Sequence, residues 1–178
     1  MGNLGYALEY EIENFFLFLE NKKREDSVLE RSHRVSFSGA MRGEKGDIVG
    51  KVPHLGITFL IECKGRYVKT KKDQMIYLER GWLDKIEEEA KSYNYFPLLI
   101  ISFKRKKEKR LWCVFKKIWI ENRLSLDMDS IKELEVREKK NIILSYNIMK
   151  NYEILTFKEL VFVSFDVLKE WLLYGLQK

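Results

Sequence analysis

The sequence predicts an α/β fold, in which a central mixed β-sheet is flanked by helices. Three observations predict it. Apolar residues recur at helical spacing near the N-terminus, two apolar runs of strand length follow, and a second helical pattern precedes a further apolar run. This order of helix, strands, helix and strand within roughly the first hundred residues is typical of an α/β sandwich.

The composition favours one folded domain. With 178 residues, of which 46% are hydrophobic, the chain is long enough for one core and short for two. Its net charge of +6 permits a polyanionic partner. The cysteines, Cys63 and Cys113, form no CxxC pair and no cluster with histidine, so neither a disulfide framework nor a zinc site is expected.

The sequence also indicates the compartment. The N-terminal segment lacks a basic stretch and carries glutamates, so we expect it not to be a signal peptide. The longest apolar run, near Phe96 to Ile101, is far below the roughly 20 residues that a membrane-spanning helix needs. We therefore expect a soluble intracellular, cytoplasmic protein without a membrane partner, with a viral or mobile-element origin left open.

The elements of the first half follow in order. A helix is predicted over residues 3 to 20, because its apolar residues lie three or four apart: Leu4, Leu8, Ile12, Phe15, Phe16 and Leu19. Arg34 to Phe37 predicts a short strand, and a polar loop leads to strands at 47 to 50 and 57 to 64.

A second helix and a buried strand complete the predicted core. Trp82 to Tyr93 has a helical pattern, with Leu83, Ile86 and Ala90 on one face. Pro97 to Phe103 is a nearly continuous apolar run, which is typical of a strand covered on both faces.

The remainder predicts an extension of the sheet and a last helix. Strands are expected near 111 to 115, 117 to 120, 141 to 147 and 160 to 164, with a short helix near 128 to 135. Ser164 is expected to cap a final helix over 165 to 175. The prediction is thus a single domain over 1 to 178, with a core at about 3 to 103 and an extension from about 104 to 178.

Charged residues end two strands that are otherwise apolar. Successive side chains of a strand alternate between faces, so Glu62 and Lys64 share one face while Ile61 and Cys63 share the other. Asp47 begins the neighbouring strand. A half-buried charge costs several kcal/mol unless something compensates it. These charges are therefore either a solvated strand end or a site.

A hard divalent cation would compensate this charge. Mg²⁺ prefers carboxylate and carbonyl oxygens, and Asp47, Glu62 and the backbone carbonyl of Cys63 offer them on adjacent strands. Mn²⁺ is an expected substitute. Lys64 would then lie near a metal-bound water and a scissile phosphate, an arrangement that suits phosphodiester hydrolysis.

These residues resemble the PD-(D/E)xK nuclease superfamily, here as Gly46-Asp47 and Glu62-Cys63-Lys64. Within it the sequence is most similar to the archaeal-type Holliday junction resolvases, in the motifs Gly5-Tyr6-Ala7-Leu8-Glu9, Ser38-Gly39, Asp47-Ile48-Val49 and Leu60-Ile61-Glu62-Cys63-Lys64. The similarity covers roughly residues 4 to 103. It implies a restriction-endonuclease-like core and a metal-dependent endodeoxyribonuclease that resolves four-way DNA junctions in recombination or repair.

The resemblance also implies roles for individual residues. Glu9, Asp47, Glu62 and Lys64 would form the catalytic set, with Glu9 among the metal ligands and Ser38 assisting from a loop. It further implies a homodimer with two sites, which cut the two strands of a junction. Basic residues are candidate DNA contacts, or ordinary surface charges: Arg31, Arg34, Arg42, Lys45, Lys69, Lys71 and Lys72.

The sequence departs from the resolvase pattern in several places. Met1-Gly2-Asn3-Leu4 replaces the basic segment that precedes the first helix of the resolvases. Gly46 stands at the superfamily's proline, Tyr10 at a frequent arginine, and Trp82 near a glutamine that begins the helix after the Glu-x-Lys strand. The segment after about residue 104 has no counterpart of that length in the small resolvases. Two alternatives stay open: another endonuclease of the superfamily, of restriction, phage or mobile-element type, and a DNA-binding module without catalysis.

Overall fold

The computed structural model describes residues 4–21, 33–34, 47–64, 68–69, 74–104, 109–121, 131–135 and 141–174. The chain forms two compact units. Unit 1 comprises Met1–Cys63 and Leu83–Leu99, and unit 2 comprises Lys64–Trp82 and Ile100–Lys178. The predicted single domain over 1 to 178 stays a prediction.

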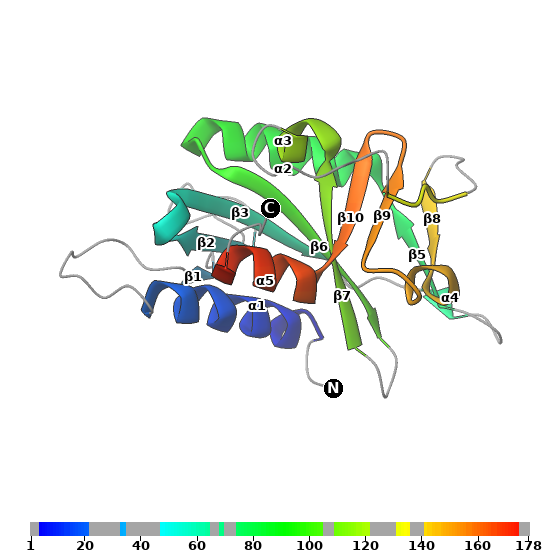
Figure 1. Ribbon diagram of the computed structural model, residues 1–178, viewed down its shortest axis with the longest axis horizontal. Helices are drawn as coiled ribbons and strands as arrows, with labels where there is room; N and C mark the ends of the chain where they lie inside the picture. Colours follow the sequence, from blue (N-terminus) through cyan, green and yellow to red (C-terminus); the bar gives the residue numbers. More distant parts are fainter. Residues whose placement is uncertain are drawn as a thin grey trace. The chain divides into compact units, whose positions relative to one another are not determined.

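Unit 1 is a layer of strands with a helix on each side (Figure 1). Its elements, some of which end in unit 2, are α1 (Leu4–Asn21), β1 (His33–Arg34), β2 (Ile48–Val52), the 3₁₀ turn η2 (Pro53–Leu55), β3 (Ile57–Lys64), α2 (Arg80–Tyr93) and the first part of β6 (Phe96–Lys104). The strands follow the order β1-β2-β3-β6, and β2 pairs antiparallel with both β1 and β3.

Helix α1 covers one face of β2 and β3. A Cβ atom added to Gly50 would meet the Phe16 ring at 2.8 Å, so glycine allows the helix to approach the strand closely. The Phe16 ring also packs against Phe59 of β3, with ring centroids 5.8 Å apart. Since side chains alternate along a strand, Phe59, Ile61 and Cys63 share this face.

Helix α2 covers the opposite face, as Figure 1 shows. Val49 of β2 and Leu60 of β3 form a buried cluster with Ile86 and Ala90 of α2. We call this side of β3 the α2 face. By strand alternation, the residues that follow Leu60 on it are Glu62 and Lys64.

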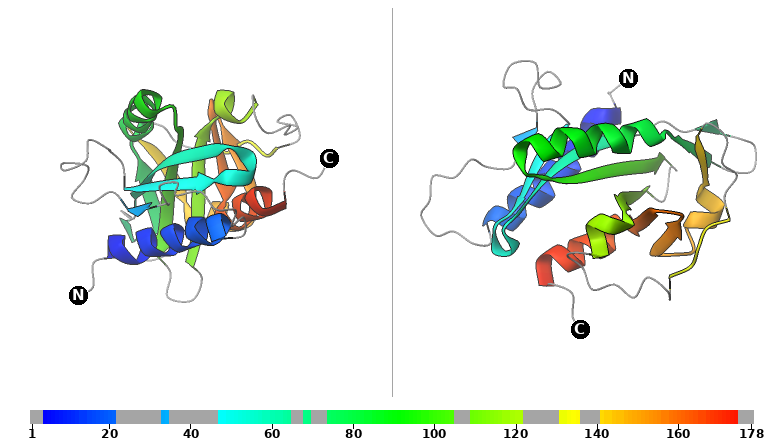
Figure 2. Two further views of the ribbon diagram at one scale, coloured as in Figure 1. Left: turned by 90° about the vertical axis from the view of Figure 1, so that its left-hand side faces the viewer. Right: turned by 90° about the horizontal axis from the view of Figure 1, so that it is seen from above.

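Unit 2 contains the remaining strands and helices. Its elements are β4 (Val68–Lys69), β5 (Gln74–Leu78), the last part of β6, β7 (Lys109–Lys116), α3 (Lys117–Glu121), β8 (Ile142–Ser145), α4 (Tyr146–Met149), β9 (Ile154–Phe157), β10 (Leu160–Ser164) and α5 (Phe165–Tyr174). The orders are β6-β7-β10-β9 and β4-β5-β8, and α4 packs beside β5 and β8 (Figure 2). Within the described residues, no helix has both the length and the apolar character to cross a membrane.

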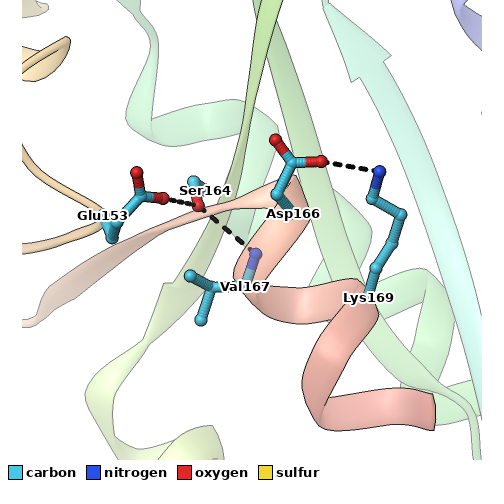
Figure 3. Close-up of polar contacts among 5 residues, drawn as sticks. All are labelled: Glu153, Ser164, Asp166, Val167 and Lys169. Atoms are coloured by element: carbon cyan, nitrogen blue, oxygen red, sulfur yellow. Dashed lines mark hydrogen bonds and ion pairs between the residues drawn. The ribbon is translucent and has the colours of Figure 1, made fainter.

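Ser164 begins helix α5 as predicted (Figure 3). Its Oγ atom accepts a hydrogen bond from the Val167 backbone N–H at 3.4 Å, and its hydroxyl donates to the Glu153 carboxylate. Lys169 lies 2.6 Å from Asp166 one turn along the helix. The serine therefore satisfies one of the N–H groups that a helix start leaves without an intrahelical acceptor.

Most predicted elements are confirmed, and with them the predicted α/β fold with a mixed sheet flanked by helices. The predicted helices at 3 to 20, 82 to 93 and 165 to 175 correspond to α1, α2 and α5. The predicted strands at 47 to 50, 57 to 64, 97 to 103, 111 to 115 and 160 to 164 correspond to β2, β3, β6, β7 and β10. Of the strand predicted at Arg34 to Phe37, only Arg34 lies within the described residues, in β1.

Three predictions were wrong, wholly or in part. The strand at 117 to 120 is helix α3, with Ile120 buried and Ile118 62% exposed. A helix was predicted at 128 to 135, but the described residues 131–135 are not helical and pair with β9. There the Leu134 backbone N–H donates to the Thr156 carbonyl at 2.7 Å. The strand predicted at 141 to 147 ends at Ser145. The Ser145 hydroxyl oxygen accepts a hydrogen bond from the Ile148 backbone N–H at 3.4 Å, so Ser145 caps the start of helix α4.

Candidate functional site

Asp47 is tied to strand β3 by two hydrogen bonds. The ladder between β2 and β3 starts with the pair Ile48–Ile61, so Asp47 lies just before it. The Asp47 N–H donates to the Ile61 carbonyl at 2.8 Å, and the Cys63 N–H donates to the Asp47 Oδ2 atom at 2.7 Å. The Asp47 carboxylate is thereby held against the peptide bond that joins Glu62 to Cys63.

The Cys63 carbonyl lies on the same side of β3. In an antiparallel ladder, the N–H and C=O of one residue point toward the same neighbouring strand. Because the Cys63 N–H points at Asp47, its carbonyl oxygen also points to the β2 side of β3. The Cys63 side chain lies on the face that α1 covers, so the thiol itself is not directed at the carboxylates.

Glu62 lies next to this contact, on the α2 face. Asp47 and Glu62 are both half-buried. Two neighbouring carboxylates that are partly withdrawn from water repel each other and favour a bound cation. A carboxylate has about four lone-pair positions, so the bond from Cys63 leaves Asp47 with acceptor capacity. Asp47, Glu62 and the Cys63 carbonyl are oxygen donors of the kind that Mg²⁺ prefers.

Lys64 ends β3 and begins unit 2. Its Nζ atom lies 5.5 Å from the ring centroid of Trp82, which belongs to the same unit and to the first turn of α2. Both side chains are half-buried. Trp82 was not among the predicted site residues. The signal in the sequence was its position near the glutamine of the resolvase pattern.

Glu9 is not gathered with the two carboxylates. It is half-buried on α1, and α1 covers the face of β3 opposite to Glu62. In the part of the chain that the structure describes, no three side chains of histidine, cysteine, aspartate or glutamate come together as a metal-binding group. The contact that the structure gives between the predicted site residues is the hydrogen bond from the Cys63 N–H to Asp47, and the metal-binding role of Glu9 stays a prediction.

Most of the predicted DNA contacts, and Ser38, lie outside the described residues. These are Arg31, Ser38, Arg42, Lys45, Lys71 and Lys72. Arg34 lies in β1 and Lys69 in β4, which places their backbones on strands. Their roles stay predictions.

A structural role for Asp47 must be weighed against the functional one. An aspartate that accepts from a backbone N–H at a strand end also stabilises the ladder without any ligand. That role accounts for Asp47 alone. Glu62 and Lys64 follow on the same face of β3. A cation bound by Asp47 and Glu62 would give both carboxylates a common role.

Comparison with known proteins gives a distant structural similarity. No protein-family model and no curated protein matches the chain. Among solved structures, the chain is similar to Hjc of Archaeoglobus fulgidus, a Holliday junction resolvase, with 15% sequence identity and a TM-score of 0.43. The match covers 83% of this chain and 88% of the other. A similarity this distant leaves the activity to be argued from the residues at the ends of β2 and β3.

Proposed function

We propose that the protein is a metal-dependent DNA endonuclease that hydrolyses phosphodiester bonds, with four-way junctions as its substrate. One observation carries this proposal. The hydrogen bond from the Cys63 N–H to Asp47 Oδ2, at 2.7 Å, holds one carboxylate beside the strand segment that carries Glu62 and Lys64. Acidic oxygen donors with a lysine two residues along the same strand are groups that support metal-assisted phosphodiester hydrolysis.

Each residue has a distinct role in this proposal. Asp47, Glu62 and the Cys63 carbonyl would hold Mg²⁺, or Mn²⁺ in its place. A bound metal would supply Lewis acidity and lower the pKa of a coordinated water. Lys64 is cationic and shares the α2 face with Glu62, so its ammonium group would offset the negative charge that grows on the scissile phosphate. Glu9 and Ser38 remain proposed contributors.

Charge supports the proposed substrate. The net charge of +6, and the basic residues near Ser38 in the sequence and near β4, favour a phosphate backbone as the partner. A homodimer would present two sites to the two strands of a junction. Sedimentation of the free protein at micromolar concentration tests this part, and a monomer there would contradict it.

The experiment is cleavage of a labelled four-way junction and a linear duplex of the same sequence, with Mg²⁺ or with a chelator. We expect the junction to be cut only with Mg²⁺ and the duplex to remain intact. Cutting of both DNAs would contradict the proposed specificity for junctions and indicate an endonuclease of broader specificity. Binding without cutting, under every divalent cation tried, would leave a DNA-binding module and refute the nuclease.

Salt dependence tests nucleic-acid binding separately from cleavage. If the protein neutralises several phosphates, the logarithm of the association constant falls linearly with the logarithm of the salt concentration. The expected slope is about −0.9 per phosphate contacted on duplex DNA. An affinity that is independent of salt would contradict a DNA substrate.

A further inference from the structure

The contact between Lys64 and Trp82 joins the proposed catalytic lysine to an aromatic ring. The Nζ atom lies 5.5 Å from the ring centroid, within the range of about 6 Å in which a cation is attracted by an aromatic face. Tryptophan provides the strongest such attraction among the aromatic side chains. Lysine, in contrast, has a flexible stem with about 2 kcal/mol of rotamer entropy.

The ring is itself held in place by the first turn of α2. The Trp82 backbone N–H donates to the Glu79 carbonyl at 3.1 Å. Arg80, two residues before Trp82, forms an ion pair with Glu159, whose carbonyl accepts from the Lys117 N–H at 2.7 Å. All of these residues belong to unit 2. The turn that carries Trp82 therefore has anchors on both its backbone and a neighbouring side chain.

We propose that Trp82 is a positioning residue for Lys64, which holds the lysine ammonium on the α2 face of β3. The inference rests on the proposed nuclease function for its catalytic consequence, whereas the contact itself does not depend on any activity. A held ammonium loses less conformational entropy when a phosphate arrives beside Glu62, so the ring would raise the rate of the chemical step. It would leave DNA affinity nearly unchanged, because phosphate contacts elsewhere determine binding.

The test uses variants of the full chain with a matched control. Trp82→Leu keeps an apolar side chain but removes the aromatic face, and Trp82→Phe retains a weaker one. Trp119→Leu is the control, because Lys116 lies over the Trp119 ring at the same 5.5 Å and neither residue belongs to the proposed site. NMR of lysine-labelled protein reports the contact directly, since side-chain protons above a ring face shift upfield. Lys64→Arg identifies the Lys64 signals.

The expected results separate positioning from a purely structural role. Lys64 signals should be shifted upfield in the wild type and in Trp119→Leu, less shifted in Trp82→Phe, and unshifted in Trp82→Leu. Junction cleavage by Trp82→Leu should show a kcat lowered about two- to five-fold with an unchanged KM. A barrier raised by the free energy of an exposed cation–π contact slows the reaction by this factor. Trp82→Phe should recover part of this loss.

Two results would overturn the inference: unshifted Lys64 signals in the wild type, or a Trp82→Leu variant with wild-type kcat. A wild type that cuts no DNA would refute the proposed function instead. In that case the NMR shift alone decides whether Trp82 holds Lys64, so the two failures remain distinguishable.

Discussion

Substitution of Gly50 by alanine tests the packing that places β2 beneath α1. The added Cβ atom would lie 2.8 Å from the Cδ1 and Cγ atoms of Phe16 and 2.9 Å from Cδ2. Phe16 is fully buried, so its ring has no solvent into which to move. The helix or the strand must therefore shift, and strain of this kind in a packed core costs about 1 to 3 kcal/mol.

The assay is urea denaturation followed by circular dichroism, with Gly81→Ala as the matched control. No atom lies within 4 Å of the Cβ position at Gly81, and this glycine is in helix α2. There alanine should stabilise by about 0.5 to 1 kcal/mol. The double variant Gly50→Ala with Phe16→Leu should be less destabilised than the sum of the two single variants, because the smaller side chain relieves the clash. If Gly50→Ala is as stable as Gly81→Ala, the close approach of α1 to β2 is wrong.

Two further predictions concern unit 2. Ser164→Ala should lower the free energy of unfolding by about 0.5 to 2 kcal/mol, because helix α5 loses its cap. The control Ser92→Ala removes an exposed serine hydroxyl and should lower the free energy of unfolding by less. Equal effects of the two substitutions would count against the cap. Burial, and secondarily the charge of Asp166, raises the pKa of the Cys113 thiol. The unfolded thiol therefore ionises first as the pH rises, and stability falls above its ordinary pKa. Wild-type stability should then fall by up to about 1.4 kcal/mol per pH unit more steeply than that of Cys113→Ala, and parallel pH profiles would contradict this.

The sequence predicted best where local pattern and burial agree. Strand β3 matches its prediction at both ends, because its apolar run is bounded by Gly56 and by the charged Glu62 and Lys64. The alternation of Ile118 and Ile120 also resembles a strand. There the chain turns into α3 once β7 has ended, so the tertiary context overrides the local preference.

Short strands that depend on distant partners were missed. Strands β4, β5 and β9 were not predicted, since β4 has two residues and the others gain their stability from pairing with β8 and β10. Nothing in their local sequence records that pairing. Helix α4 was also missed, because its start depends on the Ser145 hydroxyl rather than on an apolar pattern.

The candidate site was predictable in its residue types but not in its contacts. The placement of Asp47 beside the Glu62 strand followed from two adjacent apolar segments that end in charge. The hydrogen bond from Cys63 depends on the register between β2 and β3, and the Lys64–Trp82 contact joins two residues that β4 and β5 separate in the sequence. The face of the sheet that α1 covers is likewise a property of the folded chain.

Cleavage of a four-way junction in Mg²⁺ by Asp47→Asn, measured beside the wild type, tests the central claim most directly. Glu88→Gln is the control, because it neutralises an exposed carboxylate of α2 away from β3. Asparagine retains an oxygen that can accept from the Cys63 N–H but lacks the negative charge with which a carboxylate attracts a divalent cation. We predict loss of cleavage by at least about a hundred-fold in Asp47→Asn, with unchanged folding and an unaffected Glu88→Gln control. Wild-type cleavage by Asp47→Asn would contradict the proposed metal site.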